Sequence, residues 1–262
     1  MRFRVEESRV VFDVHPSVSA WFSTRRGGVS APPFDTLNLS YGVGDAASAV
    51  NENRRRILDT AGRDLADLVM PHQVHGNRVE WVTDAARGRG ARGAQPIEAT
   101  DGLLTDSPHV VLGLGFADCV PIFLTDREAR FVGLLHAGWR GTAAKIAERA
   151  VTLIKARGIS PADLLAGIGP SIGPCCYEVD QPVHDAIVQA IGDQPLAPKD
   201  ARHWWLDLQG ANRLILERAG VWPEHILEAG LCTGCRRDLF FSYRMEGRRT
   251  GRMGGYICLN AR

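Results

Sequence analysis

Short runs of β-branched and aromatic residues predict that this chain contains many strands. The runs lie at residues 10–14, 18–23, 68–70, 78–82, 227–231, 239–243 and 256–259. Three more apolar runs follow one another closely, at 109–115, 120–125 and 130–135. We expect these three to be central strands of a sheet.

Apolar residues at helical spacing predict four helices. The clearest pattern is one face made of Ala143, Ile146, Ala147, Ala150, Leu153 and Ile154. Thr142 is expected to cap this helix and Gly158 to end it. The other predicted helices lie at 45–62, 181–191 and 208–219.

The order of these elements favours an α+β domain with a mixed sheet. Strands come in adjacent groups between helices, whereas a doubly wound fold would alternate them strictly. The composition, with 45% hydrophobic and 23% charged residues, is that of a globular protein. No repeat and no clear linker divides the chain, so a single domain over 1–262 is expected. The Gly/Arg/Ala segment at 85–95 is predicted to be a mobile loop.

Charge and hydropathy exclude several classes of protein. The net charge is +1, so no global field favours nucleic acid. No apolar run reaches the roughly 18 residues of a membrane span. The start of the sequence has no apolar signal region, and six cysteines are too few for a disulfide scaffold at this length. We therefore expect a cytoplasmic protein with reduced or metal-bound thiols.

Three segments share one arrangement, in which a metal-ligand residue stands at a predicted strand end beside small or turn-forming residues. They are PHQVHGN with His75, FADCVP with Cys119, and LLHAGWRG with His136. Two histidines and one cysteine are a plausible ligand set for Zn²⁺, and three protein ligands leave one position open for water. Wide spacing is typical of a catalytic site assembled from several strand ends. For any one of these histidines, a purely structural role is the alternative.

Arg140 lies between His136 and the predicted helix. A strand–HAGWRG–helix arrangement directs free backbone N–H groups toward the strand end. The Arg140 guanidinium suits phosphate or carboxylate, so an anion is expected near the metal. The alternative is that Arg140 pairs with a surface aspartate.

Asp118 and Gln73 are further candidates next to the predicted ligands. On an extended chain Asp118 points away from the face of Cys119, where it would orient a ligand. It would act as acid or base only if the backbone bends there. Strand alternation puts Gln73 on the face of His75, so Gln73 is the better candidate for contact with a substrate.

Two other segments leave alternatives open. GPCCYEV contains Cys175 and Cys176, and CTGC contains Cys232 and Cys235. They suggest a second metal site or a redox pair, but adjacent cysteines on an extended chain point apart, which favours buried free thiols. FFSYRMEGRRTGRMGGY places arginines among aromatic residues, as in base-stacking surfaces, although a hairpin with solvated arginines is the commoner structure.

Together these motifs resemble the laccase-domain purine nucleoside phosphorylases, a family also called polyphenol oxidases and peptidoglycan editing factors. The resemblance runs in order over residues 23–255 and is carried by FSTRRGGVS, TLNLS, NENRRR, HQVHG, ATDGLLT, FADCVPI, HAGWRGT, GPSIGPCCYEV, CTGC, FFSYR and TGRMGG. It implies one cytosolic domain of layered β-sheets with flanking helices.

The resemblance also implies Zn²⁺ on His75, Cys119 and His136. The implied reactions are phosphorolysis of adenosine, inosine and methylthioadenosine, and hydrolytic deamination of adenosine. Phosphate would be held by Arg140, with further candidate substrate contacts at Gln73, Arg25, Arg26, Arg54 and Asn38. Cys119, His136 and Asp118 are the candidate catalytic residues. The expected partners are a purine nucleoside and phosphate, and the sequence indicates no protein partner.

Three other functions fit the same ligands. An amidase that edits peptidoglycan precursors would attack an amide with the metal-bound water or with Cys119. Copper also binds a His₂Cys set, so a copper-dependent polyphenol oxidase is an alternative, although multicopper sites need further clustered histidines. A small-molecule binding protein with structural zinc would need a fourth protein ligand.

Overall fold

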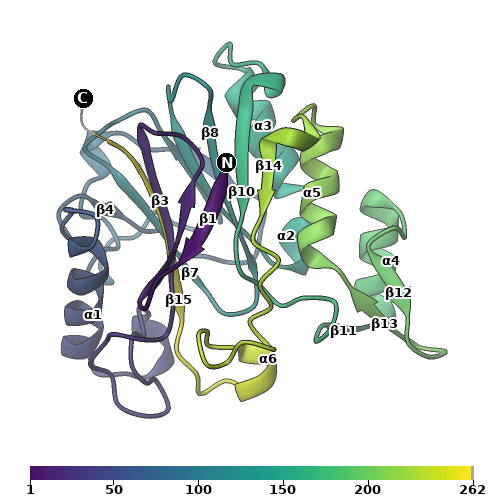
Figure 1. Cartoon of the computed structure of the whole chain (residues 1–262), viewed down its shortest axis with the longest axis horizontal. Helices are drawn as coiled ribbons and strands as arrows, with labels where there is room; N and C mark the ends of the chain where they lie inside the picture. Colours follow the sequence, from purple (N-terminus) through teal and green to yellow (C-terminus); the bar gives the residue numbers. More distant parts are fainter. Residues whose placement is uncertain (261–262) are drawn as a thin grey trace.

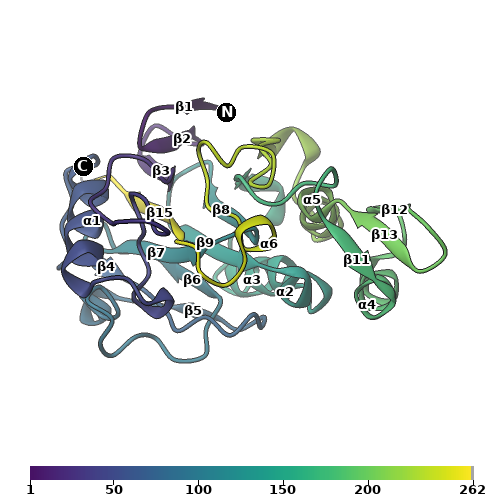
Figure 2. The same ribbon diagram turned by 90° about the horizontal axis from the view of Figure 1, so that it is seen from below.

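Two six-stranded sheets form the centre of the protein (Figure 1). The computed structural model describes residues 1–260. The first sheet has the strand order β1-β2-β3-β15-β7-β4, and the second has the order β14-β10-β8-β9-β6-β5. A smaller sheet, β11-β13-β12, lies with α4 at one side of the molecule (Figure 2). The predicted α+β class with layered mixed sheets and flanking helices is confirmed.

The strand bounds follow in chain order. They are β1 Arg2–Val5, β2 Arg9–Asp13, β3 Val18–Ser23, β4 Leu68–Val69, β5 Val79–Trp81, β6 Gly102–Thr105, β7 Val111–Phe116, β8 Val120–Asp126, β9 Val132–Ala137, β10 Leu164–Ile168, β11 Glu178–Asp180, β12 Leu196–Pro198, β13 His203–Leu206, β14 Ile226–Glu228 and β15 Met253–Leu259. The α-helices are α1 Ala47–Asp59, α2 Trp139–Ala143, α3 Ile146–Lys155, α4 Gln181–Ile191, α5 Leu208–Arg218 and α6 Tyr243–Glu246.

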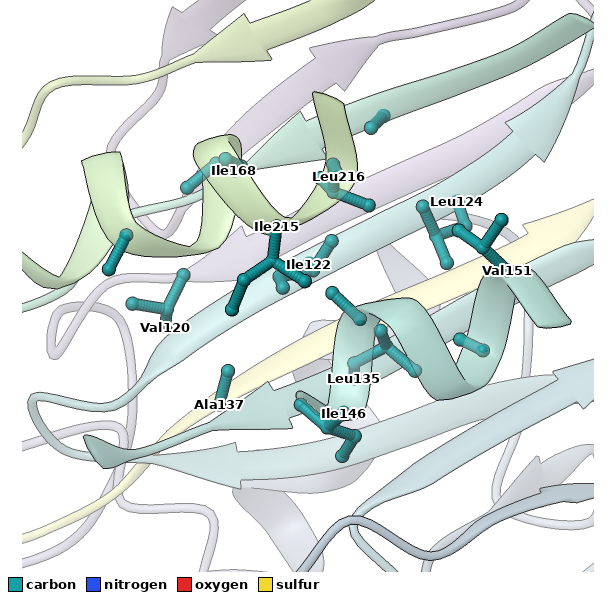
Figure 3. Close-up of a cluster of buried hydrophobic side chains, with 14 of the residues drawn as sticks. Val120, Ile122, Leu124, Leu135, Ala137, Ile146, Val151, Ile168, Ile215 and Leu216 are labelled. Atoms are coloured by element: carbon teal, nitrogen blue, oxygen red, sulfur yellow. The ribbon is translucent and has the colours of Figure 1, made fainter. Parts of the chain in front are cut away.

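Three hydrophobic clusters bind these elements into layers. One cluster fills the space between the two large sheets, with Phe22 and Leu114 from the first sheet facing Phe123 and Leu134 from the second. On the outer face of the second sheet, α3 and α5 cover Ile122, Leu124 and Leu135 (Figure 3). On the outer face of the first sheet, α1 covers a third cluster, which includes Trp21, Tyr256, Cys258, Ile57, Leu58 and Leu68. Strands β7, β8, β9 and β15 are therefore buried on both faces, as their unbroken apolar runs predict.

The helix after β9 differs from the prediction. A short helix, α2, begins at Trp139, and Lys145 in a left-handed conformation (φ 55°) separates it from α3. Thr142 is therefore inside α2 and is not a cap; its hydroxyl accepts a hydrogen bond from Asn212 Nδ2 at 2.9 Å. The apolar spacing is continuous across the break, so periodicity does not reveal it.

The predicted strand at 239–243 is wrong. Leu239 and Phe240 donate backbone hydrogen bonds to Arg236 O in a turn, and α6 begins at Tyr243. Phe240 and Phe241 are consecutive and both are fully buried, so this aromatic run fills the core without forming a strand. Within residues 1–260, no helix is both long and apolar enough to cross a membrane.

Candidate metal centre

The β8–β9 hairpin places Cys119 beside the end of β9. These strands are antiparallel, with Val120 opposite Ala137, so Cys119 lies next to Gly138. A Cβ atom on Gly138 would come within 2.9 Å of Cys119 Sγ and 3.3 Å of His75 Cδ2. Gly138, the first glycine of HAGWRG, therefore lets the β8–β9 hairpin and the His75 loop approach so closely.

His75, Cys119 and His136 lie together in the structure. Each offers a ligand atom within 4.8 Å of the other two. The His75 and His136 rings are 4.8 Å apart between centroids. His136 is buried, Cys119 is partly buried and His75 is exposed, so the cluster opens on the His75 side. His136 and Cys119 come from strand ends as expected, whereas His75 lies in the irregular segment between β4 and β5 with φ 61°.

Sequence reasoning missed the role of Asp101. Strand β6 pairs with β9 so that Gly102 is opposite Leu135, and Asp101 is therefore opposite His136. Asp101 Oδ1 lies 2.9 Å from His136 Nδ1. Because an ionised carboxylate only accepts, we assign the hydrogen to Nδ1, which leaves Nε2 of His136 free for a metal. The sequence feature that could have indicated this role is ATDGLLT, in which an aspartate directly precedes a buried strand.

Asp101 also fixes the loop that carries His75. Its carboxylate accepts the backbone N–H groups of Val74 at 3.1 Å, His75 at 3.0 Å and Gly76 at 2.8 Å. One buried carboxylate thus holds His75 through its backbone and His136 through its ring. Two of the three ligands are positioned by the same side chain.

The electrostatics of the cluster favour a thiolate at Cys119. Burial raises the pKa of Cys119, but His136 and His75 lower it more, to about 6. Burial lowers the pKa of His136, but Cys119 and Asp101 raise it more, to about 9. The thiolate is the form of cysteine that binds metals.

Two cavities meet at this cluster. The larger, about 650 Å³, is lined by His75, His136, Gln73, Arg54 and Arg252, among others. The smaller, about 240 Å³, is lined by His75, Cys119, Asp118, Arg140, Tyr177 and Arg244, among others. His75 and Tyr243 line both cavities. The ligand cluster therefore stands between two chambers that each contain arginine side chains.

Comparisons with known proteins place this architecture in one family. The family model described as multi-copper polyphenol oxidoreductase laccase matches residues 19–260. The chain belongs to this laccase family. Purine nucleoside phosphorylase YlmD from Geobacillus stearothermophilus is 44% identical over 243 residues, which are 91% of this chain and 89% of that protein. The solved structure of YlmD from the same organism superposes with a TM-score of 0.96 at 40% identity and covers 99% of each chain.

A second relative has a different activity in its name. Adenosine deaminase RL5, from an unknown prokaryotic organism, is 36% identical over 236 residues, which are 88% of this chain and 90% of that protein. The resemblance inferred from the sequence motifs is thus confirmed at the level of the family.

Arg140 of this laccase-family protein is available to a ligand. Its guanidinium lies 4.2 Å from the centroid of the Trp139 ring and lines the smaller cavity. Within residues 1–260 it forms no ion pair, so the predicted alternative of a surface aspartate partner is not what the structure has. Arg244 faces the same cavity from α6, where its guanidinium lies 5.0 Å from the Tyr177 ring. Figures 1 and 2 show α2 and α6 at the same end of the second sheet.

Gln73 and Arg54 line the larger cavity but also hold the backbone. Gln73 is not in a strand, so the alternation argument for it is wrong; its amide bonds both to Gly115 N, at 2.8 Å, and to Gly115 O, at 2.9 Å. Arg54 is buried and donates to the carbonyls of Leu39, Gly90 and Ala91. The 85–95 loop, predicted to be mobile, is thus tied to α1 through Arg54.

The structure does not bring Arg25, Arg26 and Asn38 to either cavity. Arg25 pairs with Glu246 at 2.7 Å, and Arg26 pairs with Asp238 at 3.4 Å. Asn38 is fully buried and accepts the N–H of Arg252 at 2.9 Å. All three join the first 40 residues to the C-terminal segment, and that pairing gives them a structural role.

Asp118 is buried in a hydrogen-bonded socket. Its backbone does bend, with φ 82°. Oδ1 accepts the hydroxyls of Thr233 at 2.6 Å and Ser242 at 2.8 Å, and Oδ2 accepts the N–H of Arg244 at 2.7 Å. Both carboxylate oxygens accept hydrogen bonds, so the Asp118 side chain holds the start of α6 close to the next residue, Cys119.

The C-terminal segment of arginine and aromatic residues supplies cavity residues that the sequence pattern did not identify. The hairpin expected there is wrong, because α6 and a turn lead into β15. Tyr243, Arg244 and Arg252 come from it, and the Arg252 guanidinium lies 5.6 Å from the Tyr243 ring. The mixture of arginine and aromatic residues was the available signal.

Proposed function

We propose that this protein is a zinc-dependent purine nucleoside phosphorylase that also deaminates adenosine. Its substrates would be adenosine, inosine and methylthioadenosine, cleaved with phosphate to the free base and ribose 1-phosphate. The single observation that carries the proposal is the His75–Cys119–His136 cluster, positioned by Asp101 between two arginine-lined cavities. The names of YlmD and RL5 support both reactions.

The donor set fits zinc. Two imidazoles, one thiolate and an outer carboxylate on His136 form the arrangement typical of zinc with three protein ligands. A multicopper centre would need further clustered histidines. Within residues 1–260 the second metal-competent group contains only cysteines. When bound, zinc would supply a Lewis acid and lower the pKa of a bound water.

The protein's own residues would divide the work of phosphorolysis. Arg140 and Arg244 would hold phosphate in the smaller cavity, since both guanidinium groups face it and Arg140 has no carboxylate partner there. The nucleoside would lie across His75, with its base in the larger cavity. A phosphate oxygen then bonds to C1′ as the bond from C1′ to the base breaks, and the base leaves with the electron pair and takes a proton from solvent. Asp118 has a positioning role in this scheme.

Deamination would use the same cluster without phosphate. Water adds to C6 of adenine, ammonia leaves, and inosine is the product. Arg140 is not needed for this reaction, because no phosphate takes part. The two activities are therefore separable by substitution on the smaller cavity.

The test is to incubate adenosine with the zinc-loaded protein, with and without phosphate, and to separate the products by chromatography. We expect adenine and ribose 1-phosphate only with phosphate. Inosine should form in either case and should be cleaved further to hypoxanthine when phosphate is present. His136→Ala should abolish both reactions, whereas His109→Ala, at an exposed histidine outside both cavities, should change neither. Adenosine left intact by zinc-loaded protein, or equal product from His136→Ala, would contradict the proposal.

A further inference from the structure

Four cysteines from two loops come together away from the His75 cluster. Cys175 and Cys176 lie between β10 and β11, and Cys232 and Cys235 follow β14. All four sulfur atoms lie within 4.8 Å of one another. Cys235 Sγ is 3.4 Å from Cys175 Sγ and 3.5 Å from Cys176 Sγ. Neither of the two cavities described above is lined by any of these cysteines.

The structure overturns the argument that adjacent cysteines must point apart. Residues 174–176 form a turn, in which the N–H groups of Cys176 and Tyr177 both donate to Gly173 O at 3.0 Å. Side chains alternate between faces only on an extended chain, and a turn removes that alternation. Cys175 and Cys176 can therefore both face the 232–235 turn.

The backbone holds the two loops against each other. Ser171 and Cys232 form an isolated parallel bridge, in which Ser171 N donates to Leu231 O and Thr233 N donates to Ser171 O. A Cβ atom on Gly234 would lie 2.9 Å from Cys176 Cβ and 3.0 Å from its sulfur. The CTGC turn thus packs on Cys176 so closely that only glycine fits at position 234.

We propose that Cys175, Cys176, Cys232 and Cys235 bind a second zinc ion as a structural site with four sulfur ligands. Zinc–sulfur bonds of about 2.3 Å in a tetrahedron separate the sulfurs by about 3.8 Å, so the observed cluster needs little adjustment. A disulfide would need sulfurs about 2.05 Å apart. Four protein ligands leave no open position, so this zinc would stabilise the fold and not take part in catalysis. The thiols bind as thiolates and release their protons to solvent.

The surroundings of Cys232 support a thiolate. Gly173 N–H donates to Cys232 Sγ at 3.2 Å. Backbone N–H groups directed at a ligand sulfur are the kind of outer contact that orients metal ligands.

This zinc would clamp the two loops that surround Asp118. Ile172, in the first loop, donates its N–H to Asp118 O at 2.9 Å. Thr233, in the second loop, donates its hydroxyl to Asp118 Oδ1 at 2.6 Å. Asp118 precedes Cys119, so the four-cysteine cluster supports the catalytic centre from behind without touching its cavities.

The first test counts zinc per chain in protein purified under reducing conditions, by elemental analysis and native mass spectrometry. We expect two zinc ions in the wild type, one in Cys232→Ser, one in His136→Ala and none in the double variant. Cys258→Ala, which changes a buried cysteine outside both clusters, should keep two. The proposal would be overturned if the wild type held only one zinc ion and Cys232→Ser also retained it.

The second test needs no variant, so it stands even if Cys232→Ser fails to fold. Cys175 and Cys235 are exposed. As zinc ligands they should resist alkylation in the native protein and react once a chelator removes the metal. Immediate alkylation of both thiols before chelation would overturn the proposal. A protein mass two hydrogens below that of the fully reduced chain would also overturn it, because it would reveal a disulfide.

Discussion

The two cysteine-containing clusters of this protein differ in how they are built. His75, Cys119 and His136 come from three segments, stand between two cavities and have a buried carboxylate behind one ligand. The four-cysteine cluster comes from two turns, has four sulfurs and lines neither of those cavities. Three ligands facing open space suit reaction on a substrate, whereas four ligands in packed turns suit stabilisation. The number of ligands and the access to a cavity, and not the presence of cysteine, separate the two roles.

The largest difference should appear when one ligand is removed from each cluster. His136→Ala should lower kcat/KM for phosphorolysis by more than the roughly 10²–10³-fold that follows loss of a single electrostatic group. Cys232→Ser should lower it by much less, because no substrate reaches that cluster. Steady-state rates at saturating phosphate measure both. Equal losses in the two variants would remove the distinction between the clusters.

Asp101→Asn tests the support behind the proposed metal ligands His75 and His136. The charge that orients His136 is lost while the shape is kept, so zinc affinity and activity should fall by about 10–100-fold. Competition with a chelator measures the affinity. Asp106→Asn, at an exposed aspartate paired with Arg157, is the matched control and should leave the affinity unchanged. An unaltered affinity in Asp101→Asn would show that this carboxylate does not support a metal.

Arg140→Ala should separate the two reactions proposed for the His75 cluster. A hydrogen bond to a charged group contributes about 1.5–3 kcal/mol, so the KM for phosphate should rise by roughly tenfold or more. Deamination should keep its rate. Arg157→Ala removes an arginine that lies over Trp81, outside both cavities, and should change neither reaction. A phosphate KM unaffected by Arg140→Ala would place the anion elsewhere.

The smallest effect on activity, but a clear one on stability, is expected for Cys232→Ser. A ligand present at 100 times its Kd stabilises by about 2.7 kcal/mol, which corresponds to roughly 5–10 °C in Tm for a chain of this size. Calorimetry in zinc-containing buffer measures this shift. A Tm equal to that of the wild type would argue against a structural metal in these turns.

The sequence predicted the His75–Cys119–His136 cluster better than it predicted the residue that supports the cluster. His75, Cys119 and His136 were identifiable because each has a ligand side chain beside small or turn-forming residues. Asp101 was not, because its role depends on the β6–β9 register, which places it opposite His136 only in the folded sheet. Register follows from tertiary packing, and periodicity along one strand does not specify it.

The arginines show the same limit. Arg25 and Arg26 form a basic pair beside glycines, which is a reasonable anion site when the segment is considered alone. Their partners Glu246 and Asp238 lie more than 200 residues away in the sequence. Sequence reasoning identifies a charge, but only the fold shows whether another side chain of the chain already neutralises it.

The most direct test of the account is a stepwise removal of zinc from the wild-type protein by a chelator, with zinc content and adenosine phosphorolysis measured on the same samples. The three-ligand site should release its metal first. We predict that activity falls to zero as the first of two zinc ions leaves, and that the second leaves later with a loss of Tm. Activity that survives until the last zinc is removed, or a protein that holds one zinc only, would contradict the account.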